Sequence, residues 1–152
     1  PVITVEPQPF RQQMAHDLGA DVVIDPTAGN LVEQVLDHTS GRGATLILEC
    51  SGSNGALAAS LDVVAKQGRI VLIGQSAGRK VPVEIGKAIF ERTTIVGSSG
   101  SPYFFPKTLT FMSRQLVDLM PVVTHQFPLD QIMDAFELGK SGAGCAKILV
   151  LP

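Results

Sequence analysis

The chain has 152 residues, of which 45% are hydrophobic, and this size suits one globular domain with a buried core. Its 12 Lys and Arg against 14 Asp and Glu give a formal net charge of −2, and no basic stripe indicates a nucleic-acid-binding surface. The apolar runs are far shorter than the ~18 residues of a membrane-spanning helix, so we expect a soluble, cytoplasmic protein without nucleic-acid or membrane partners.

The first two thirds of the chain alternate short apolar strands with helices. We predict strands over 2–5, 21–25, 45–49, 69–73 and 93–96, and helices over 9–18, 31–39, 56–65 and 85–91. Gly19 suits the position that follows a helix, and Leu31, Val35 and possibly His38 are predicted to face inward. The alternation favours the α/β class, with a doubly wound parallel sheet and right-handed crossovers.

The last third departs from this alternation. We predict helices over 107–120 and 130–139, an extended segment over 121–128 and a terminal strand over 145–151. This part is expected to form an α+β tail in a different structural layer.

Ligands of open parallel sheets bind beyond the carboxyl ends of the strands. Glu6 follows the first predicted strand, and its carboxylate suits the paired hydroxyls of a ribose and repels a 2′-phosphate, which favours NAD over NADP. Arg11 is placed to lie over an adenine. The structural alternative is that Glu6 caps the helix that begins at Pro9, where the helix dipole favours an acid.

Small residues follow the later strand ends. Cys50 and Ser51 come after the strand over 45–49 and would let a ribose or a flat ring approach the backbone, although a tight turn has the same composition. Ile73 and Gly74 follow the next strand, and Ser98, Ser99 and Gly100 follow the strand over 93–96. Backbone N–H and C=O groups at these two ends suit a carboxamide.

A glycine-rich phosphate-binding turn is expected about 20 residues before the ribose-binding acid. Only five residues precede Glu6. In the doubly wound order, the strand before that turn lies between the strands over 2–5 and 45–49. We therefore expect the sheet to lack its first strand, and the chain to be part of a longer enzyme. By itself, this chain is expected to be inactive and to bind NAD weakly.

Neither a catalytic group nor a metal site is predicted in this chain. His16, His38 and His125 have no Cys, His or carboxylate at metal-ligand spacing, so we expect structural roles for them. Cys50 and Cys145 lie outside any CxxC motif, which favours a reducing compartment. A Gly-x-Ser-x-Gly nucleophile motif is also absent from the sequence.

Several of these motifs together resemble the cofactor domain of the medium-chain zinc dehydrogenases. They are Val5-Glu6 followed by Phe10-Arg11, Leu18-Gly19-Ala20-Asp21, Glu49-Cys50-Ser51-Gly52 and Gly68-Arg69-Ile70-Val71-Leu72-Ile73-Gly74. The tail, with Thr124-His125-Gln126-Phe127-Pro128-Leu129, Ala135-Phe136-Glu137 and Lys147-Ile148-Leu149-Val150, is similar to the sorbitol and threonine dehydrogenase branch.

This resemblance implies a partial Rossmann-type dinucleotide-binding domain over 1–97 and a segment over 98–152 that returns to a catalytic domain. It implies Glu6 for the adenosine ribose, with Arg11 beside it, and Cys50 and Ser51 along the dinucleotide. The backbone at Ile73, Gly74 and 98–100 is implied for the nicotinamide end.

The activity implied by the resemblance is hydride transfer between an alcohol or polyol and NAD, assisted by zinc. The zinc ligands of such enzymes lie in an N-terminal domain that this chain does not include. The edge strand over 93–96 matches one that pairs between subunits, which implies a homo-oligomer, either a dimer or a tetramer.

One departure bears on the substrate. Ser98-Ser99-Gly100 stands where polyol dehydrogenases often have Phe-Arg-Tyr, whose Arg contacts the pyrophosphate, so a sorbitol-like substrate is not implied. Lys147 either replaces that charge or is a solvated residue at a strand start. Two other functions stay open: a zinc-free NADPH-dependent reductase of the same superfamily, and a non-catalytic nucleotide-binding or dimerisation module.

Overall fold

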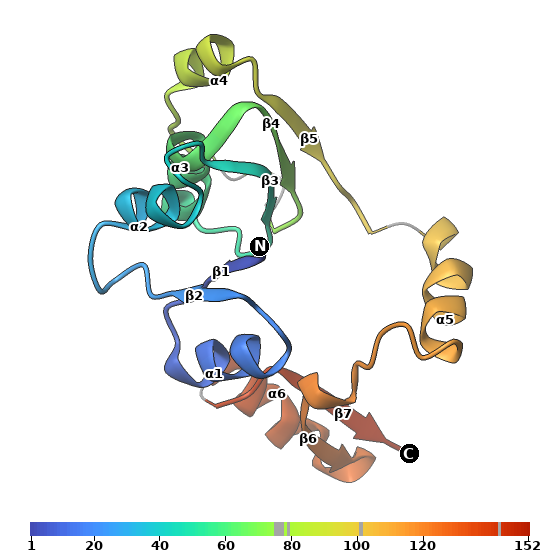
Figure 1. Ribbon diagram of the computed structural model, residues 1–152. Helices are drawn as coiled ribbons and strands as arrows, with labels where there is room; N and C mark the ends of the chain where they lie inside the picture. Colours follow the sequence, from blue (N-terminus) through green and yellow to red (C-terminus); the bar gives the residue numbers. More distant parts are fainter. Residues whose placement is uncertain (75–77, 79, 101, 143) are drawn as a thin grey trace. The chain divides into compact units, whose positions relative to one another are not determined.

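A computed structural model describes residues 1–74, 78, 80–100, 102–142 and 144–152 (Figure 1). The helices are α1 (Pro9–Asp17), α2 (Leu31–His38), α3 (Asn54–Val63), α4 (Ile85–Glu91), α5 (Phe105–Ser113) and α6 (Ile132–Ser141). The strands are β1 (Ile3–Val5), β2 (Val22–Ile24), β3 (Ala44–Glu49), β4 (Val64–Leu72), β5 (Thr94–Gly97), β6 (Val123–Pro128) and β7 (Lys147–Leu151). The predicted α/β class is confirmed. Residues 75–77 and 79, which come after the predicted strand over 69–73, lie outside the described residues.

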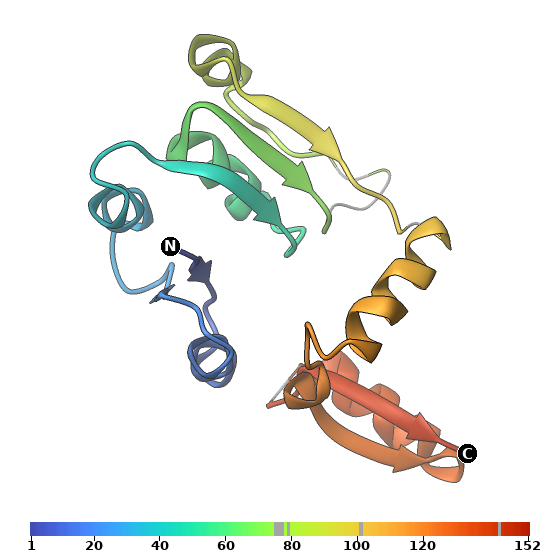
Figure 2. The ribbon, with the colours of Figure 1, turned by 45° about the vertical axis from the view of Figure 1, so that its right-hand side comes forward.

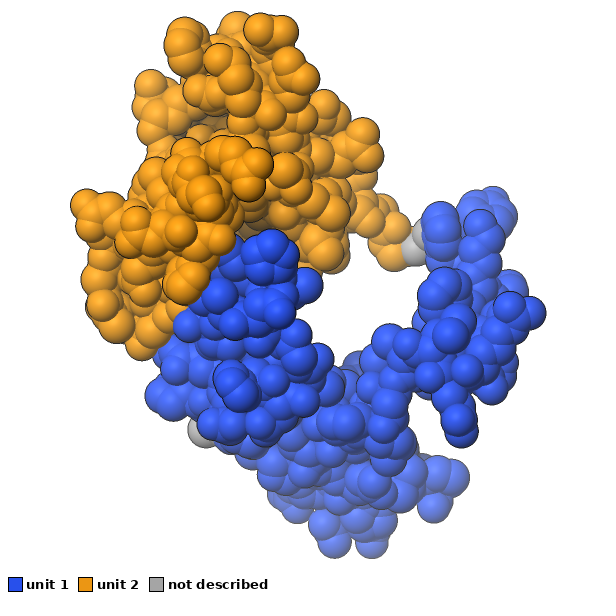
Figure 3. Space-filling view, viewed as in Figure 1, with its two compact units in different colours: residues 1–23, 101–152 blue, residues 24–100 orange. Residues whose placement is uncertain are grey.

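The chain forms two compact units (Figure 3). Unit 1 contains residues 1–23 and 101–152, and unit 2 contains residues 24–100. Among the described residues the strands form three separate ladders, β1-β2, β3-β4-β5 and β6-β7.

Unit 2 is built on a parallel sheet, whose strands β3, β4 and β5 run side by side (Figure 2). Its buried cluster joins Leu61 of α3 and Ala88 of α4 to Val64 and Ile70 of β4, and Ile70 has no exposed surface. Helices α3 and α4 are therefore held against the sheet by apolar burial, the main favourable term in folding.

The end of α3 differs from the prediction. The helix was expected to run to Ala65, but it ends at Val63, and Val64 is extended with φ −68° and ψ 137°. Val64 pairs with Ala44 of β3, which makes β4 longer than the predicted strand over 69–73. The apolar residues at this boundary suit a helix face or a buried strand equally, and the long-range pairing with β3 decides between them.

Helix α2 begins at a side-chain cap. The Asn30 Oδ1 accepts hydrogen bonds from the backbone N–H groups of Val32 and Glu33 at 3.1 and 3.4 Å. Val35, at 3% exposure, faces inward as predicted, whereas His38 is exposed and the prediction that it faces inward is wrong. His38 lies in the last helical turn, where a basic side chain is favoured by the helix dipole without burial.

Unit 1 combines two segments that are distant in sequence. β1 is paired with β2, and α1 ends before Gly19, whose φ of +94° fits the position predicted for it. The C-terminal segment has the parallel pair β6-β7, with α6 packed on both strands. Helix α5 is shorter than the predicted helix over 107–120, because Gln115 has a left-handed φ of 52° just beyond Ser113.

Candidate functional site

The carboxyl ends of the three strands in unit 2 are in register. Glu49 of β3 is paired with Leu72 of β4, and Leu72 is paired with Gly97 of β5. Hydrogen bonds continue this register past the strands, since Ile73 N donates to Glu49 O at 2.8 Å and Ser98 N donates to Leu72 O at 2.9 Å. The residues that follow the strands therefore start from one common edge, where ligands of parallel sheets bind.

The turn after β3 is organised around the carboxylate of Glu49, which is 4% exposed. Its Oε1 accepts hydrogen bonds from Ser51 N at 2.9 Å, Ser51 Oγ at 2.6 Å and Gly52 N at 3.0 Å. Hydrogen bonds to an ionised acceptor are stronger than neutral ones, and they offset the cost of burying the charge. Glu49 was not among the predicted site residues. A sequence signal exists, because an acid that ends an apolar strand and precedes Ser-Gly can accept from the turn that follows.

Gly52 and Gly74 bring the backbones after β3 and β4 into direct contact. A Cβ on Gly74 would lie 2.6 Å from the carbonyl carbon and oxygen of Cys50, and one on Gly52 would collide with the Gly74 carbonyl. Gly52 also has a φ of +66°, a left-handed conformation that favours glycine. The backbones that follow β3 and β4 are thus in direct contact at Gly52 and Gly74.

Cys50 directly follows β3, and its carbonyl lies against Gly74. The residue as a whole is exposed, but partial burial of its thiol raises the pKa, and the charge of Glu49 raises the pKa further. A raised pKa keeps the thiol protonated and weakly nucleophilic. The Cys50 side chain is therefore suited to packing against a ligand and unsuited to attacking one.

Glu6 lies directly after β1 and is half-buried. Its Oε1 accepts a hydrogen bond from the backbone N–H of Gln8 at 2.9 Å, and Gln8 is the residue at the start of α1. This bond reaches the residue that precedes helix α1, and among the described residues no side-chain capping bond to the helix itself is formed. It does not displace the ribose hypothesis, because an ionised carboxylate has about four acceptor sites and one hydrogen bond uses one of them.

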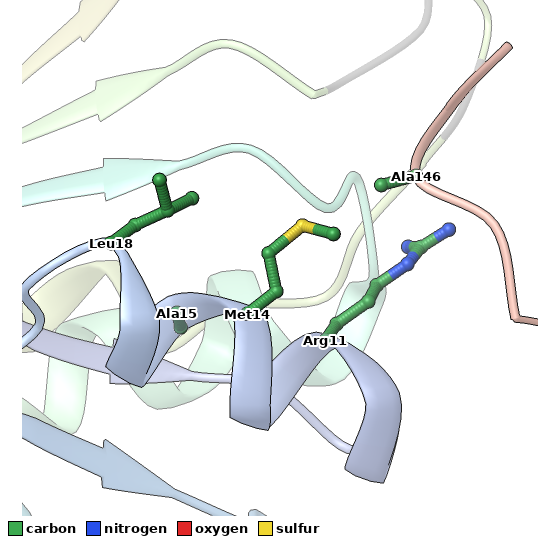
Figure 4. A pocket seen from close by; sticks show the side chains of 5 residues that line it. All are labelled: Arg11, Met14, Ala15, Leu18 and Ala146. Carbon is green, nitrogen blue, oxygen red and sulfur yellow. The ribbon is translucent and has the colours of Figure 1, made fainter. Parts of the chain in front are cut away.

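Arg11 contacts the C-terminal segment. Its Nη2 donates to the carbonyl of Cys145 at 3.1 Å, while its Nε is buried without a hydrogen-bond partner among the described residues. Arg11 lines a 330 Å³ pocket with Met14, Ala15 and Leu18 of α1 and with Ala146. Figure 4 shows the guanidinium extending from α1 toward Ala146.

The predicted site residues therefore fall into two groups. Glu6 and Arg11 belong to unit 1. The other group follows the three strands of unit 2 and consists of Cys50, Ser51, Ile73, Gly74, Ser98, Ser99 and Gly100.

A metal site is not formed by the described residues, where no group of three or more His, Cys, Asp or Glu side chains is arranged to hold an ion. These residues do not fit a zinc ion, so no zinc-dependent step is assigned to them. In the described part of the chain, every helix falls short of the length and apolarity needed to cross a membrane.

The parallel sheet of β3, β4 and β5, with helices between its strands, defines an α/β fold of the Rossmann type. Solved structures agree with this class. A protein from Sinorhizobium meliloti 1021 that was solved bound to NADP has a TM-score of 0.91 at 24% identity, and the match covers 99% of this chain and 45% of that one. For 2R,3R-butanediol dehydrogenase from Bacillus subtilis, the TM-score is 0.88 at 26% identity, with 99% and 43% covered.

Sequence comparison gives the family. Residues 1–114 match the family model described as "Zinc-binding dehydrogenase", and the chain belongs to this family. L-threonine 3-dehydrogenase of Caldanaerobacter subterraneus subsp. tengcongensis is 33% identical, and the match covers 99% of this chain. This match covers 44% of that relative, so the chain spans less than half of its length. The resemblance seen in the sequence motifs is confirmed.

Proposed function

We propose that this chain forms the NAD-binding part of a dehydrogenase that transfers a hydride between an alcohol or polyol and the cofactor. The observation that carries the proposal is the register of Glu49, Leu72 and Gly97, which starts three ligand-facing segments from one sheet edge. An extended dinucleotide needs contacts spread along such an edge. Membership of the zinc-binding dehydrogenase family supports the reaction class.

Within this proposal each predicted residue keeps the role expected for it. Glu6 binds the hydroxyls of the adenosine ribose, and Arg11 lies beside it, over the adenine. Cys50 and Ser51 flank the middle of the dinucleotide. The nicotinamide carboxamide meets backbone groups of Ile73, Gly74 and the segment 98–100.

NAD is proposed over NADP because a carboxylate at Glu6 repels a 2′-phosphate and accepts from a ribose diol. The competing assignment is a zinc-free, NADPH-dependent reductase of the same superfamily. The two assignments differ in a property that can be measured directly, the ratio of the two cofactor affinities.

Further features of the whole protein are proposed from the family. The dinucleotide-binding part covers 1–97, the segment 98–152 returns to a catalytic domain, and zinc ligands come from residues outside this chain. The 152-residue chain is therefore proposed to be inactive by itself. A cytoplasmic homo-oligomer is also proposed. The β5 strand of each chain is suited to pairing between subunits because all four of its residues are exposed.

Calorimetric titration of the complete natural polypeptide with NAD and with NADP tests the cofactor assignment. We expect at least about tenfold tighter binding of NAD, the ratio that corresponds to ~1.4 kcal/mol. Glu6→Gln should reduce this ratio, because it removes the repelling charge, and the exposed Glu33→Gln should leave it unchanged. Tighter binding of NADP by the natural protein would overturn the NAD assignment.

Turnover assays test the reaction class. Incubation of the complete polypeptide with a panel of secondary alcohols, diols and L-threonine should produce NADH, detected by its absorbance. If NAD binds but no alcohol is oxidised with any member of the panel, the non-catalytic nucleotide-binding module becomes the better description. The isolated 152-residue chain serves as the comparison and is expected to give no NADH.

A further inference from the structure

Glu49, the buried acid at the end of β3, accepts hydrogen bonds from the turn that follows the strand. Three donors converge on Glu49 Oε1, namely Ser51 N, Ser51 Oγ and Gly52 N. These bonds fix the turn that leads from β3 into α3. Because two of the donors are backbone N–H groups, the carboxylate determines the path of the main chain as well as the orientation of the serine.

The main-chain carbonyl of Glu49 fixes the neighbouring segment. It accepts hydrogen bonds from Ile73 N at 2.8 Å and Gly74 N at 3.0 Å, both directly after β4. One residue therefore binds two separate parts of the proposed site, the turn through its side chain and the end of β4 through its backbone.

Close packing makes these two attachments interdependent. A Cβ on Gly74 would lie 2.6 Å from Cys50 O, and Gly52 is packed equally closely against the Gly74 carbonyl. Protein interiors at this packing density transmit displacements because few voids can absorb them. A shift of the turn at Gly52 would therefore displace Gly74.

We propose that Glu49 is a positioning residue that holds the turn at 50–52 and the end of β4 in the arrangement that receives the cofactor. This inference rests on the proposed NAD site. Glu49 itself is buried and acts through the turn, so it is not assigned a contact with cofactor or substrate.

The same bonds restrict what Ser51 offers to a ligand. Its hydroxyl proton is donated to Glu49 Oε1 at 2.6 Å, and its Oγ accepts from Ser53 N at 3.0 Å. Its backbone N–H is also bound to Glu49. Ser51 is therefore a poor donor to the cofactor, and it contributes to the site by packing and by its small size.

Two substitutions of Glu49 in the complete polypeptide test the positioning role. Glu49→Ala removes the acceptor, and Glu49→Gln keeps an uncharged oxygen that can accept from the same two backbone N–H groups. In the alanine variant we expect the amide hydrogens of Ser51 and Gly52 to exchange about tenfold faster, the factor that corresponds to loss of one ordinary hydrogen bond. The KM for NAD should rise by about the same factor with kcat within about twofold, which is the pattern of lost cofactor binding.

Glu49→Gln should recover most of the exchange protection and of the KM. Glu84→Gln, which alters an exposed acid near Lys87, is the matched control and should change neither quantity. If Glu49→Ala fails to fold, Ser51→Ala combined with Glu49→Gln replaces it. This pair removes the hydroxyl bond and the charge, so the amide hydrogen of Gly52 should exchange faster than in Glu49→Gln alone, and equal exchange in the two variants would overturn the positioning role.

The outcomes separate this inference from the proposed function. Unchanged amide exchange and unchanged KM in a folded Glu49→Ala variant would overturn the positioning role while leaving the NAD site intact. If the natural protein binds no NAD, the proposed function and the cofactor-related part of the inference both fall, and the exchange measurement still decides whether Glu49 holds the turn.

Discussion

Gly52 and Gly74 are packed backbone against backbone, so that neither position has room for a Cβ. Gly74→Ala should therefore lower the free energy of unfolding by about 2 kcal/mol, a typical cost of overpacking. Urea denaturation measures this loss. Gly86→Ala in α4 is the matched control, because nothing lies within 4 Å of the added Cβ, and it should stabilise the helix by ~0.5–1 kcal/mol. Equal stabilities of the two variants would contradict the close packing.

The contribution of the Asn30 cap of α2 to the free energy of unfolding should be measurable with a single substitution. Asn30→Ala removes the oxygen that accepts from Val32 N and Glu33 N, and we expect a loss of ~1 kcal/mol of stability. Gln8→Ala, at the corresponding position of α1, is the control because the Gln8 side chain makes no capping hydrogen bond. A loss of similar size in both variants would show that the side-chain cap is not its cause.

Arg11 has two proposed roles that thermal unfolding can separate. Its hydrogen bond to the carbonyl of Cys145 predicts that Arg11→Gln destabilises the protein by ~1 kcal/mol in the absence of NAD. Its cofactor role predicts a smaller stabilisation of the variant by added NAD. The exposed Arg42→Gln should show neither effect. If Arg11→Gln has unchanged stability and a reduced response to NAD, the hydrogen bond to Cys145 does not stabilise the protein and only the cofactor role of Arg11 is supported.

The Cys50 thiol should titrate at higher pH than a free cysteine, first because of burial and then because of the Glu49 charge. Its alkylation rate, followed by mass spectrometry of the Cys50 peptide, should therefore rise at higher pH in the folded protein than in urea. Because the folded-state pKa is raised, the folded state loses stability as the pH rises from the unfolded thiol's pKa through the folded one. Glu49→Gln should move the alkylation profile part of the way back.

The alternation of strands and helices in unit 2 could be predicted because its periodicity is local. The end of α3 could not, since Val64 and Ala65 suit a buried helix face as well as a strand, and only pairing with Ala44 assigns them to β4. The end of α5 was missed for a similar reason. Its termination depends on the left-handed φ of Gln115, which glutamine rarely adopts and which its sequence context does not indicate.

The candidate site was predictable where it follows strand ends, because topology places those residues together. Glu49 was missed because an acid at a strand end is usually solvated, and its burial depends on donors supplied by the next three residues. The bond from Arg11 to Cys145 was also beyond sequence reasoning. It joins residues 134 positions apart, whereas sequence patterns report local structure.

That bond also bears on how the chain is assembled during synthesis. Unit 2 is continuous over residues 24–100, while unit 1 needs residues 1–23 together with residues 101–152. Domains fold as units while the chain grows, so the β3-β4-β5 sheet can form as soon as residue 100 has emerged. The amino-terminal strand and helix, in contrast, wait several seconds at ordinary elongation rates for the carbonyl of Cys145. During that interval residues 1–23 lack the contact that the carbonyl of Cys145 provides.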